Sequence, residues 1–170
     1  MRRILIVGNS GGGKSTLARS LGEKLALPII HLDILFWKPG WVELSDDEFR
    51  VQVAGALEGP AWICDGNSPG TADIRFPRAD TIVWIDQPRW RCLFRAMSRV
   101  VTYRGRHTRP DMAAGCDEKF DLDFYRYIWT FDEKVRPRVE AALEAHGRRA
   151  RVVRLSSDRE IAAFLESAEA

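Results

Sequence analysis

A glycine-rich octapeptide at residues 8–15, GNSGGGKS, is the segment of this chain with the clearest chemistry. It fits the pattern G-x-x-x-x-G-K-[S/T], follows an apolar run and precedes a helix-compatible segment. Glycines let main-chain amides curve around a phosphate, and the next helix directs its positive dipole end at the same anion. Lys14 is then expected to contact the β and γ phosphates, and the Ser15 hydroxyl to bind Mg²⁺. The predicted ATP contacts are Gly8, Ser10, Gly11, Gly12, Gly13, Lys14, Ser15 and Thr16.

Two aspartates, Asp65 and Asp86, each directly follow an apolar run. Mg²⁺ bound to a triphosphate is commonly supported by an acid at the end of a neighbouring strand. Either aspartate could instead cap a helix or a turn. We favour Asp65, because the Gly66-Asn67 turn that follows it permits close approach of a ligand. The predicted metal-site residues are therefore Ser15 and Asp65.

Asp33 ends the second apolar run and precedes an aromatic segment. Ligands of open α/β sheets bind beyond the carboxyl ends of the strands, so Asp33 is expected on the same rim as Lys14. It would contact the acceptor substrate or take the acceptor's proton, or it would serve only as a cap or an ion-pair partner. His31 is expected to be a packed histidine. The aromatic residues Phe36, Trp37 and Trp41 either form the floor of an acceptor pocket or make a small separate core.

Arginine is concentrated between Gln87 and Pro110, a stretch with seven arginines and no acidic residue. Arg91, Arg95 and Arg99 recur every four residues and would share one helix face. The chain from there to Cys116 contains glycine and proline and few helix signals, as a mobile flap would. Such a flap could bring arginines onto a transferring phosphoryl group and exclude water. The alternative is a solvated helix face followed by a loop.

The elements that must position these residues follow an alternating pattern. Short apolar runs and helical stretches alternate along the chain, which is typical of a parallel sheet covered by helices on both faces. The runs are at 4–7, 29–32, 61–64, 81–85 and 151–155. The helices are expected at 15–26, 45–57, 88–101, 121–145 and 161–168, with a break in the fourth near Arg136-Pro137, because proline lacks an amide hydrogen. Capping boxes are expected at Ser45 with Glu48 and at Ser157 with Glu160.

The composition limits the class of protein. The 170 residues are 45% hydrophobic, enough for one domain with its own core. The net charge of +2 does not suggest a nucleic-acid coat protein, and no apolar run is long enough for a membrane span or a signal peptide. We expect a soluble, cytoplasmic protein, monomeric or homodimeric. The three cysteines have no metal or redox spacing and are expected to be reduced.

The chain resembles the adenylate kinase-like branch of the small P-loop nucleoside monophosphate kinases, and within it bacterial proteins that carry the name DNA topology modulation protein. The resemblance covers nearly the full length and rests on residues 8–15, 31–41, 62–67, 95–99 and 106–112. It implies a single domain over 1–170 with the three-layer α/β/α P-loop fold. Its five-stranded parallel sheet would have the order 2-3-1-4-5, with an acceptor-binding insert at about 34–57 and a lid at about 103–120.

The resemblance also implies roles for individual residues. The cofactors would be ATP and Mg²⁺, with Asp65 in the water shell of the metal. Arg95 would lie along the adenine, and the loop containing Ser156 would run beside the base. The catalytic set implied in this way, together with Asp33, is Lys14, Arg99, the lid residues Arg106 and Arg109, and Arg126; Arg136 is a weaker candidate.

Two departures from adenylate kinases concern the acceptor. Those enzymes place an arginine three residues after the aspartate equivalent to Asp33 and another four residues after the one equivalent to Asp65, where this chain has Phe36 and Pro69. Without them an AMP phosphate would lose charge-assisted hydrogen bonds worth roughly 1.5–3 kcal/mol each. We therefore expect a phosphotransferase that is not an efficient AMP kinase, unless Arg75 or Arg78 compensates. The alternatives are a nucleotide-dependent regulator that binds DNA or RNA, and an inactive P-loop scaffold.

Overall fold

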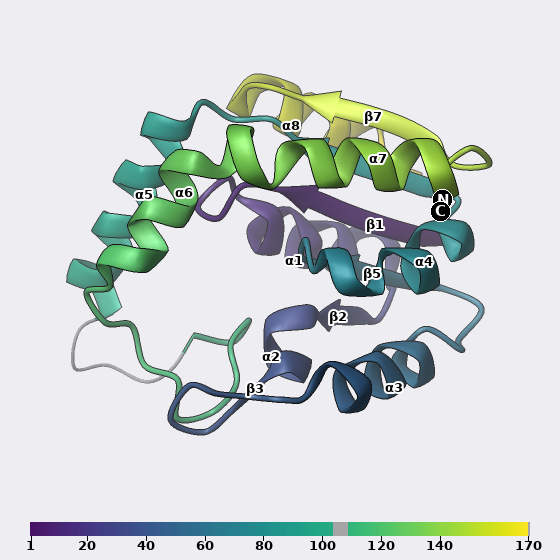
Figure 1. Ribbon diagram of the computed structural model, residues 1–170. Helices are drawn as coiled ribbons and strands as arrows, with labels where there is room; N and C mark the ends of the chain where they lie inside the picture. Colours follow the sequence, from purple (N-terminus) through teal and green to yellow (C-terminus); the bar gives the residue numbers. More distant parts are fainter. Residues whose placement is uncertain (104–108, 170) are drawn as a thin grey trace.

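The computed structural model describes residues 1–103 and 109–169, which form an α/β fold around a five-stranded parallel sheet (Figure 1). The strands of this sheet are β1 (Arg3–Gly8), β2 (Ile29–His31), β5 (Trp62–Asp65), β6 (Thr81–Ile85) and β7 (Arg151–Leu155). A separate antiparallel hairpin consists of β3 (Trp37–Lys38) and β4 (Val42–Glu43). The helices are α1 (Lys14–Leu25), α2 (Leu32–Phe36), α3 (Asp46–Ala56), α4 (Ala72–Arg75), α5 (Arg89–Tyr103), α6 (Leu122–Lys134), α7 (Arg136–His146) and α8 (Asp158–Ser167), and short 3₁₀ turns span Pro69–Thr71 and Phe76–Arg78.

The order of the main sheet is β2-β5-β1-β6-β7. Counted over the five apolar runs alone, this is the expected order 2-3-1-4-5. The strand numbers differ because the hairpin β3-β4, which the sequence analysis did not foresee, is counted between them. All four pairings are parallel, so the carboxyl ends of the strands meet at one edge of the sheet.

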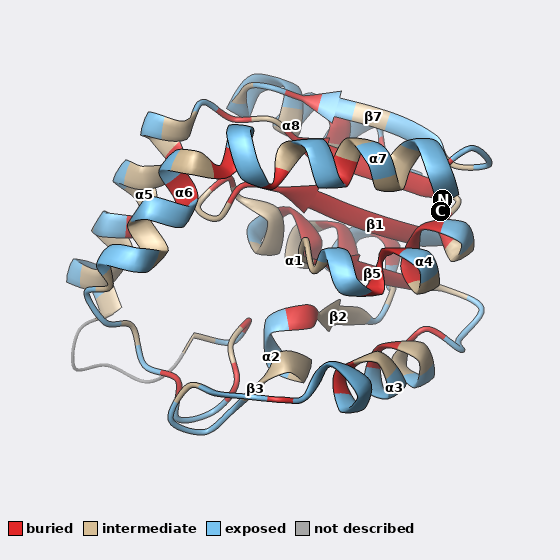
Figure 2. Ribbon diagram, in the orientation of Figure 1, coloured by how far each residue is buried: buried red, intermediate tan, exposed pale blue. Residues whose placement is uncertain are grey.

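The sheet is covered on both faces, and its strands alternate between two cores (Figures 1 and 2). Leu5 and Val7 of β1 belong to the core on the side of α3, α4, α6 and α7. Ile4 and Ile6 belong to the core under α1 and α8. This is the period-two alternation of a strand buried on both faces, and it explains why β1 is a continuous apolar run in the sequence.

Local signals explain most helix boundaries. The side chain of Ser45 accepts a hydrogen bond from the amide of Glu48, and the Glu48 carboxylate accepts one from the amide of Ser45, so the expected capping box is present. The expected break between 121 and 145 separates α6 from α7 at Val135, one residue before Arg136-Pro137. The last helix begins at Asp158 rather than at 161, with Ser157 as its N-cap.

Two stretches differ from expectation. The second strand ends at His31, and Asp33 lies in the first turn of α2 rather than at a strand end. Residues 69–78 form α4 between two 3₁₀ turns, where no helix was expected. Both helical pieces are short, four and five residues, and packing against α3 holds them in place better than helix propensity could.

Candidate functional site

The turn after β1 has a shape that only glycine accommodates at two of its positions. Gly8 has a φ of +139°, and a Cβ atom there would lie 2.2 Å from the carbonyl oxygen of Ile85. Gly11 has a φ of +81°, and a Cβ atom there would lie 2.2 Å from the carbonyl oxygen of Cys92. The turn therefore packs its main chain directly against the end of β6 and the start of α5.

Side-chain amides fix this turn from two sides. Asn67, in the turn after β5, accepts a hydrogen bond from the Gly8 amide at 2.9 Å and donates one to the Gly8 carbonyl at 2.7 Å. Asn9 donates to the carbonyl of Ile128 in α6 at 2.9 Å. Asn67 therefore occupies both main-chain groups of Gly8. Gly8 supports the turn and does not line the cleft, although the sequence analysis predicted it as an ATP contact.

At the start of α1, a chain of polar contacts connects the P-loop hydroxyl to two neighbouring strands. Ser15 donates from Oγ to Oδ2 of Asp65 at 2.7 Å, and His31 Nδ1 lies 2.5 Å from Oδ1 of the same carboxylate. Burial lowers the pKa of His31, but the Asp65 carboxylate outweighs it, so this pKa lies above its ordinary value. Asp65 is only 5% exposed. A hydroxyl and a carboxylate are oxygen donors of the kind that Mg²⁺ prefers.

A buried arginine holds the turn that contains Asn67. Arg75 is 0% exposed and donates from Nε to Thr71 Oγ1 at 2.8 Å and from its terminal nitrogens to the carbonyls of Gly66, Asn67 and Ser68. Its donors are thus consumed inside the protein. Arg78 donates to the carbonyl of Ala54. Neither arginine lines the cleft, so neither compensates for the two missing acceptor arginines.

Asp33 and Lys14 both line the cleft, and their charges interact. Although Asp33 as a residue is exposed, the groups around its carboxyl displace part of its water and raise its pKa, an effect that Lys14 opposes. Burial lowers the pKa of Lys14, while Asp65 and Asp33 act in the opposite direction. The Lys14 ammonium donates to the carbonyl of Asn9 at 3.1 Å. The expected proximity of Asp33 to Lys14 is thus present, although Asp33 comes from a helix.

The segment that follows the undescribed residues 104–108 brings further charged groups to the site. Arg109 lies 3.2 Å from Asp111 and 2.8 Å from Glu118, and Arg99 of α5 lies 3.4 Å from the same oxygen of Glu118. Burial raises the pKa of Asp111, but Arg109 and the Ser15 hydroxyl outweigh it and lower that pKa overall. Asp111 therefore lies near Ser15, on which Asp65 also converges. Glu118 neutralises part of the charge of two predicted phosphate arginines.

The hairpin β3-β4 and the 109–120 segment form a continuous wall. The amide of Gly40 donates to the carbonyl of Gly115 at 3.1 Å, and Trp41 donates from Nε1 to the carbonyl of Asp117 at 3.2 Å. Figure 1 shows this segment running alongside β3. Trp37 stands edge-on to Phe36 on one side and to Trp41 on the other, with ring centroids 4.9 and 5.3 Å apart. These three rings line the cleft, and Phe36 also packs on Phe49.

These elements enclose a cleft of about 1360 Å³ at the carboxyl edge of the sheet. This is larger than a typical single-ligand pocket of about 300–1,000 Å³, and it has room for two ligands side by side. The predicted site residues that line it are Ser10, Gly11, Gly12, Gly13, Lys14, Ser15, Thr16, Asp33, Asp65, Arg95, Arg99 and Arg109.

Three predicted residues are not in the cleft, and one is not described. Besides Gly8, Ser156 is directed elsewhere: its amide and its hydroxyl both bond to the Glu160 carboxylate, where they complete the cap of α8. Arg126 is exposed on α6 and does not line the cleft, because the inward face of that helix presents Ile128 and Phe131 instead. Arg106 lies outside the described residues.

At the other end of the cleft, Arg95 forms an ion pair with Asp158, the first residue of α8. Its terminal nitrogen lies 2.9 and 2.8 Å from the two carboxylate oxygens of Asp158, which also accepts from Arg91 at 3.3 Å. Asp158 lines the cleft beside Arg95. The arginine helix α5 and the start of α8 therefore meet at this end of the cleft.

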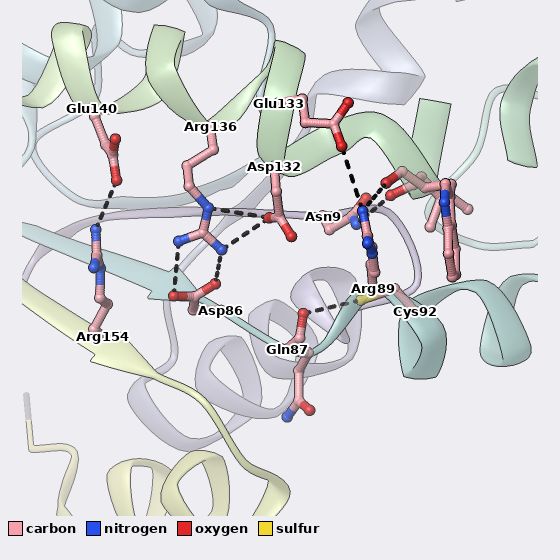
Figure 3. A network of polar contacts seen from close by, with 12 residues as sticks. Asn9, Asp86, Gln87, Arg89, Cys92, Asp132, Glu133, Arg136, Glu140 and Arg154 are labelled. Carbon is pink, nitrogen blue, oxygen red and sulfur yellow. Dashed lines mark hydrogen bonds and ion pairs between the residues drawn. The ribbon is translucent and has the colours of Figure 1, made fainter. Parts of the chain in front are cut away.

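Asp86, the alternative metal residue, is used elsewhere (Figure 3). Arg136 bonds to both of its carboxylate oxygens and also donates to Asp132 one turn earlier. These carboxylates raise the pKa of Arg136. Asp86 and Arg136 both lie outside the cleft, so of the two candidate aspartates only Asp65 is in contact with Ser15.

Sequence reasoning missed several residues that shape the site. His31 touches Asp65, Asp111 lies near Ser15, Glu118 pairs with two arginines, and Arg75 holds the Asn67 turn. The only available signal was indirect: Asp111 lies two residues after Arg109 in a segment that already carried the family resemblance. The cluster depends on contacts between residues up to about a hundred positions apart, which spacing alone does not reveal.

The comparisons with known proteins support the fold. No family model and no curated protein matches the chain. Among solved structures, the chain is similar to shikimate kinase from Bacteroides thetaiotaomicron, with a TM-score of 0.54 and 18% identity over 97% of this chain and 94% of that chain. At this identity the likeness establishes a P-loop kinase fold. It does not support the narrower resemblance to proteins named DNA topology modulation protein.

Two features are absent from the described residues. No group of three or more His, Cys, Asp or Glu side chains there is arranged to hold a metal ion. Magnesium in phosphoryl-transfer sites is commonly held by one or two protein oxygens together with substrate phosphates, so such a group is not required. Within residues 1–103 and 109–169, no helix has the length and apolar character that crossing a bilayer requires.

Proposed function

We propose that this protein is an ATP- and Mg²⁺-dependent phosphotransferase that acts on a small acceptor. The observation that carries the proposal is the convergence of Lys14, Ser15 and Asp65 with Asp33 in a single cleft large enough for two ligands. A P-loop that served only as a scaffold would have no need of an acidic group and an aromatic wall facing its lysine. The P-loop kinase fold supports the same reading.

In this proposal the nucleotide phosphates bind in the turn at 10–16, and the adenine lies beside the ion pair of Arg95 with Asp158. Lys14 and Arg99 contribute positive charge around the transferring phosphoryl group. Arg109 does so from the opposite wall, where Glu118 and Asp111 hold its guanidinium in place. Catalysis of this kind is mainly a matter of position and electrostatics.

Ser15 and Asp65 would hold the Mg²⁺, and Asp111 is close enough to join them. The metal supplies charge neutralisation at the β and γ phosphates. His31 fixes the Asp65 carboxylate through its second oxygen, so that the first oxygen remains directed at Ser15.

Asp33 is the proposed contact to the acceptor hydroxyl. It lies beyond the sheet edge, opposite Lys14 and beside the aromatic wall. A carboxylate in this position orients the hydroxyl and accepts its proton during transfer. Phe36 and Pro69 occupy the positions of the two missing arginines, and Arg75 and Arg78 are directed into the protein, so we propose that AMP is not an efficient acceptor.

The regulator that binds nucleic acid is less well supported. Its arginines are largely paired within the protein: Arg91 and Arg95 with Asp158, Arg99 with Glu118, and Arg89 with Glu133. Arg89 is also stacked on the Trp129 ring, 4.5 Å from its centroid. Paired arginines offer less charge for releasing counterions from a phosphate backbone.

The direct test uses a Lys14→Ala variant. ATP binding with Mg²⁺ is measured by calorimetry, and ADP release is followed by a coupled assay with a panel of hydroxylated metabolites. We expect turnover to fall by about 10²–10³-fold, the usual cost of removing one group that stabilises transition-state charge. Lys24→Ala is the matched control, because Lys24 is on the same helix but bonds to the C-terminal carbonyls of α8. Unchanged ATP binding and turnover in folded Lys14→Ala would contradict the proposal.

A further inference from the structure

Acidic side chains outnumber basic ones among the residues that line the cleft, eight to six. The acids include Asp33, Glu43, Asp65 and Asp111, and the basic residues outside the P-loop and α5 are Arg19, Arg109 and Lys119. A site that binds a phosphate or a carboxylate has the reverse balance, with arginines in bidentate position.

These three cations are mostly engaged with the protein's own groups. Arg109 is 10% exposed and lies between Asp111 and Glu118. The Lys119 ammonium lies over the Trp41 ring at 5.3 Å and 3.9 Å from Asp121. Arg19 comes from the α1 side, where its charge acts on His31. An anionic acceptor would have to displace these contacts before it gained any of its own.

The nearby arginines outside the cleft are committed as well. Arg75 has no free donor directed outward, since its bonds go to the turn at 66–68 and to Thr71. Arg50 forms a two-point ion pair with Asp73. Arg75 cannot turn toward the acceptor without breaking several buried hydrogen bonds, which costs more than one new ion pair returns, and Arg50 would have to give up its pair with Asp73.

The wall beside Asp33 is aromatic. Phe36, Trp37 and Trp41 pack along it in T-shaped, edge-to-face contacts, and Phe36 belongs to the same short helix as Asp33. Aromatic faces bind the apolar faces of rings, and they also attract cations. An anion gains nothing from the negative face of a ring. The acidic group and the neighbouring aromatic rings therefore select in the same direction.

We infer that the phosphoryl acceptor is a hydroxylated compound that carries no phosphate or carboxylate group and is neutral or cationic. Its hydroxyl meets Asp33, and its body packs on the wall of Phe36, Trp37 and Trp41. This inference rests on the proposed function and deepens it by naming the acceptor class. The transfer balances as for any kinase: the hydroxyl oxygen bonds to the γ-phosphorus, the bond from that phosphorus to the β–γ bridging oxygen breaks, and the hydroxyl proton goes to Asp33.

The experiment uses acceptor pairs that differ only in charge, with the protein saturated by Mg²⁺ and a non-hydrolysable ATP analogue. The pairs are adenosine with AMP, glycerol with glycerol 3-phosphate, and ethanolamine with phosphoethanolamine. Binding is measured by calorimetry, and ADP release is measured separately with ATP. We expect at least one uncharged or cationic member to bind tenfold or more tightly than its phosphorylated partner and to stimulate ADP release. The glycerol and ethanolamine pairs separate neutral from cationic preference.

Anionic members that bind as tightly as their partners, or a panel in which no member of either charge binds, would overturn the inference. Failure of the proposed function is recognised separately, because wild-type protein would then not bind the ATP analogue at all. Phe36→Arg should gain binding of AMP or glycerol 3-phosphate, whereas the matched Phe36→Met should not. Pro69→Arg is a second variant with the same expectation in case Phe36→Arg does not fold, and Arg19→Ala shows whether any anion binding in wild type depends on Arg19.

Discussion

Arg75 offers a test of how the site is supported, because it is a fully buried cation whose donors serve the active-site turn. Replacement by methionine keeps much of the side-chain volume and removes every donor. The carbonyls of Gly66, Asn67 and Ser68 and the hydroxyl of Thr71 then lose their partner. A buried polar group left unsatisfied costs about 1–3 kcal/mol. Removing one buried, desolvated charge returns part of this, and water entry relieves more, so we expect a net loss of about 3–5 kcal/mol in the free energy of unfolding.

A loss of this size is a large share of the 5–15 kcal/mol that is typical for a domain. It is measured by urea unfolding, from the shift in midpoint at constant slope. Arg50→Met is the matched control: Arg50 bonds to Gly70 and Asp73 near the same turn, but it is exposed, so its removal should change the free energy of unfolding much less than Arg75→Met does. If Arg75→Met unfolds within 1 kcal/mol of wild type, the turn is not held as described. Nucleotide affinity should fall with Arg75→Met, because Asn67 positions Gly8.

Three further predictions concern the site and its surroundings. The pKa of Asp33 lies above its ordinary 3.8, chiefly because neighbouring groups displace water from its carboxyl, so on acidification the decline in turnover should begin at a higher pH than for an ordinary aspartate. Asp33→Asn should lower kcat by about 10²–10⁴-fold and abolish this limb of the pH profile; a variant that keeps both would refute the role of Asp33. Gly11→Ala should weaken nucleotide binding at least tenfold, measured by calorimetry, because the new Cβ would collide with the Cys92 carbonyl. Gly55→Ala is the control, because Gly55 is in an open position of α3; it should leave nucleotide binding intact and change the free energy of unfolding by no more than about 1 kcal/mol. All three cysteines are free and buried, and burial raises the pKa of Cys64 to about 12, so native protein should react with a thiol reagent only on unfolding; rapid labelling of one thiol would contradict the described packing.

The regular elements were largely predictable because their signals are local. Each signal, such as the apolar run of β1, the apolar run of β6 or the capping box at Ser45, is contained within a few consecutive residues and reports its own element. The pieces that sequence reasoning missed, α2, α4 and the hairpin β3-β4, are short and have little intrinsic stability. They form because the rest of the protein packs against them, so their own residues give only a weak local signal for a helix or a strand.

The candidate site divides in the same way. The P-loop was readable because its glycines, lysine and serine act within eight residues of chain. The choice between Asp65 and Asp86 depended on which partner each one meets, and that partner, Ser15 or Arg136, lies about fifty residues away. Arg126 shows that a residue's position in a motif does not fix where its side chain points. The rotation of the helix about its axis decides whether the side chain faces the cleft.

The sequence by itself determined that a phosphate-binding turn follows a buried strand and that the chain alternates strands and helices. Only the tertiary structure decided which charges remain available in the cleft. Arg75 serves the protein's own carbonyls, Glu118 offsets part of the charge of Arg99 and Arg109, and Asp33 interacts with Lys14 in the cleft. The physical reason is that the charge a ligand encounters depends on distances between residues far apart in the chain, and such distances are set by tertiary packing.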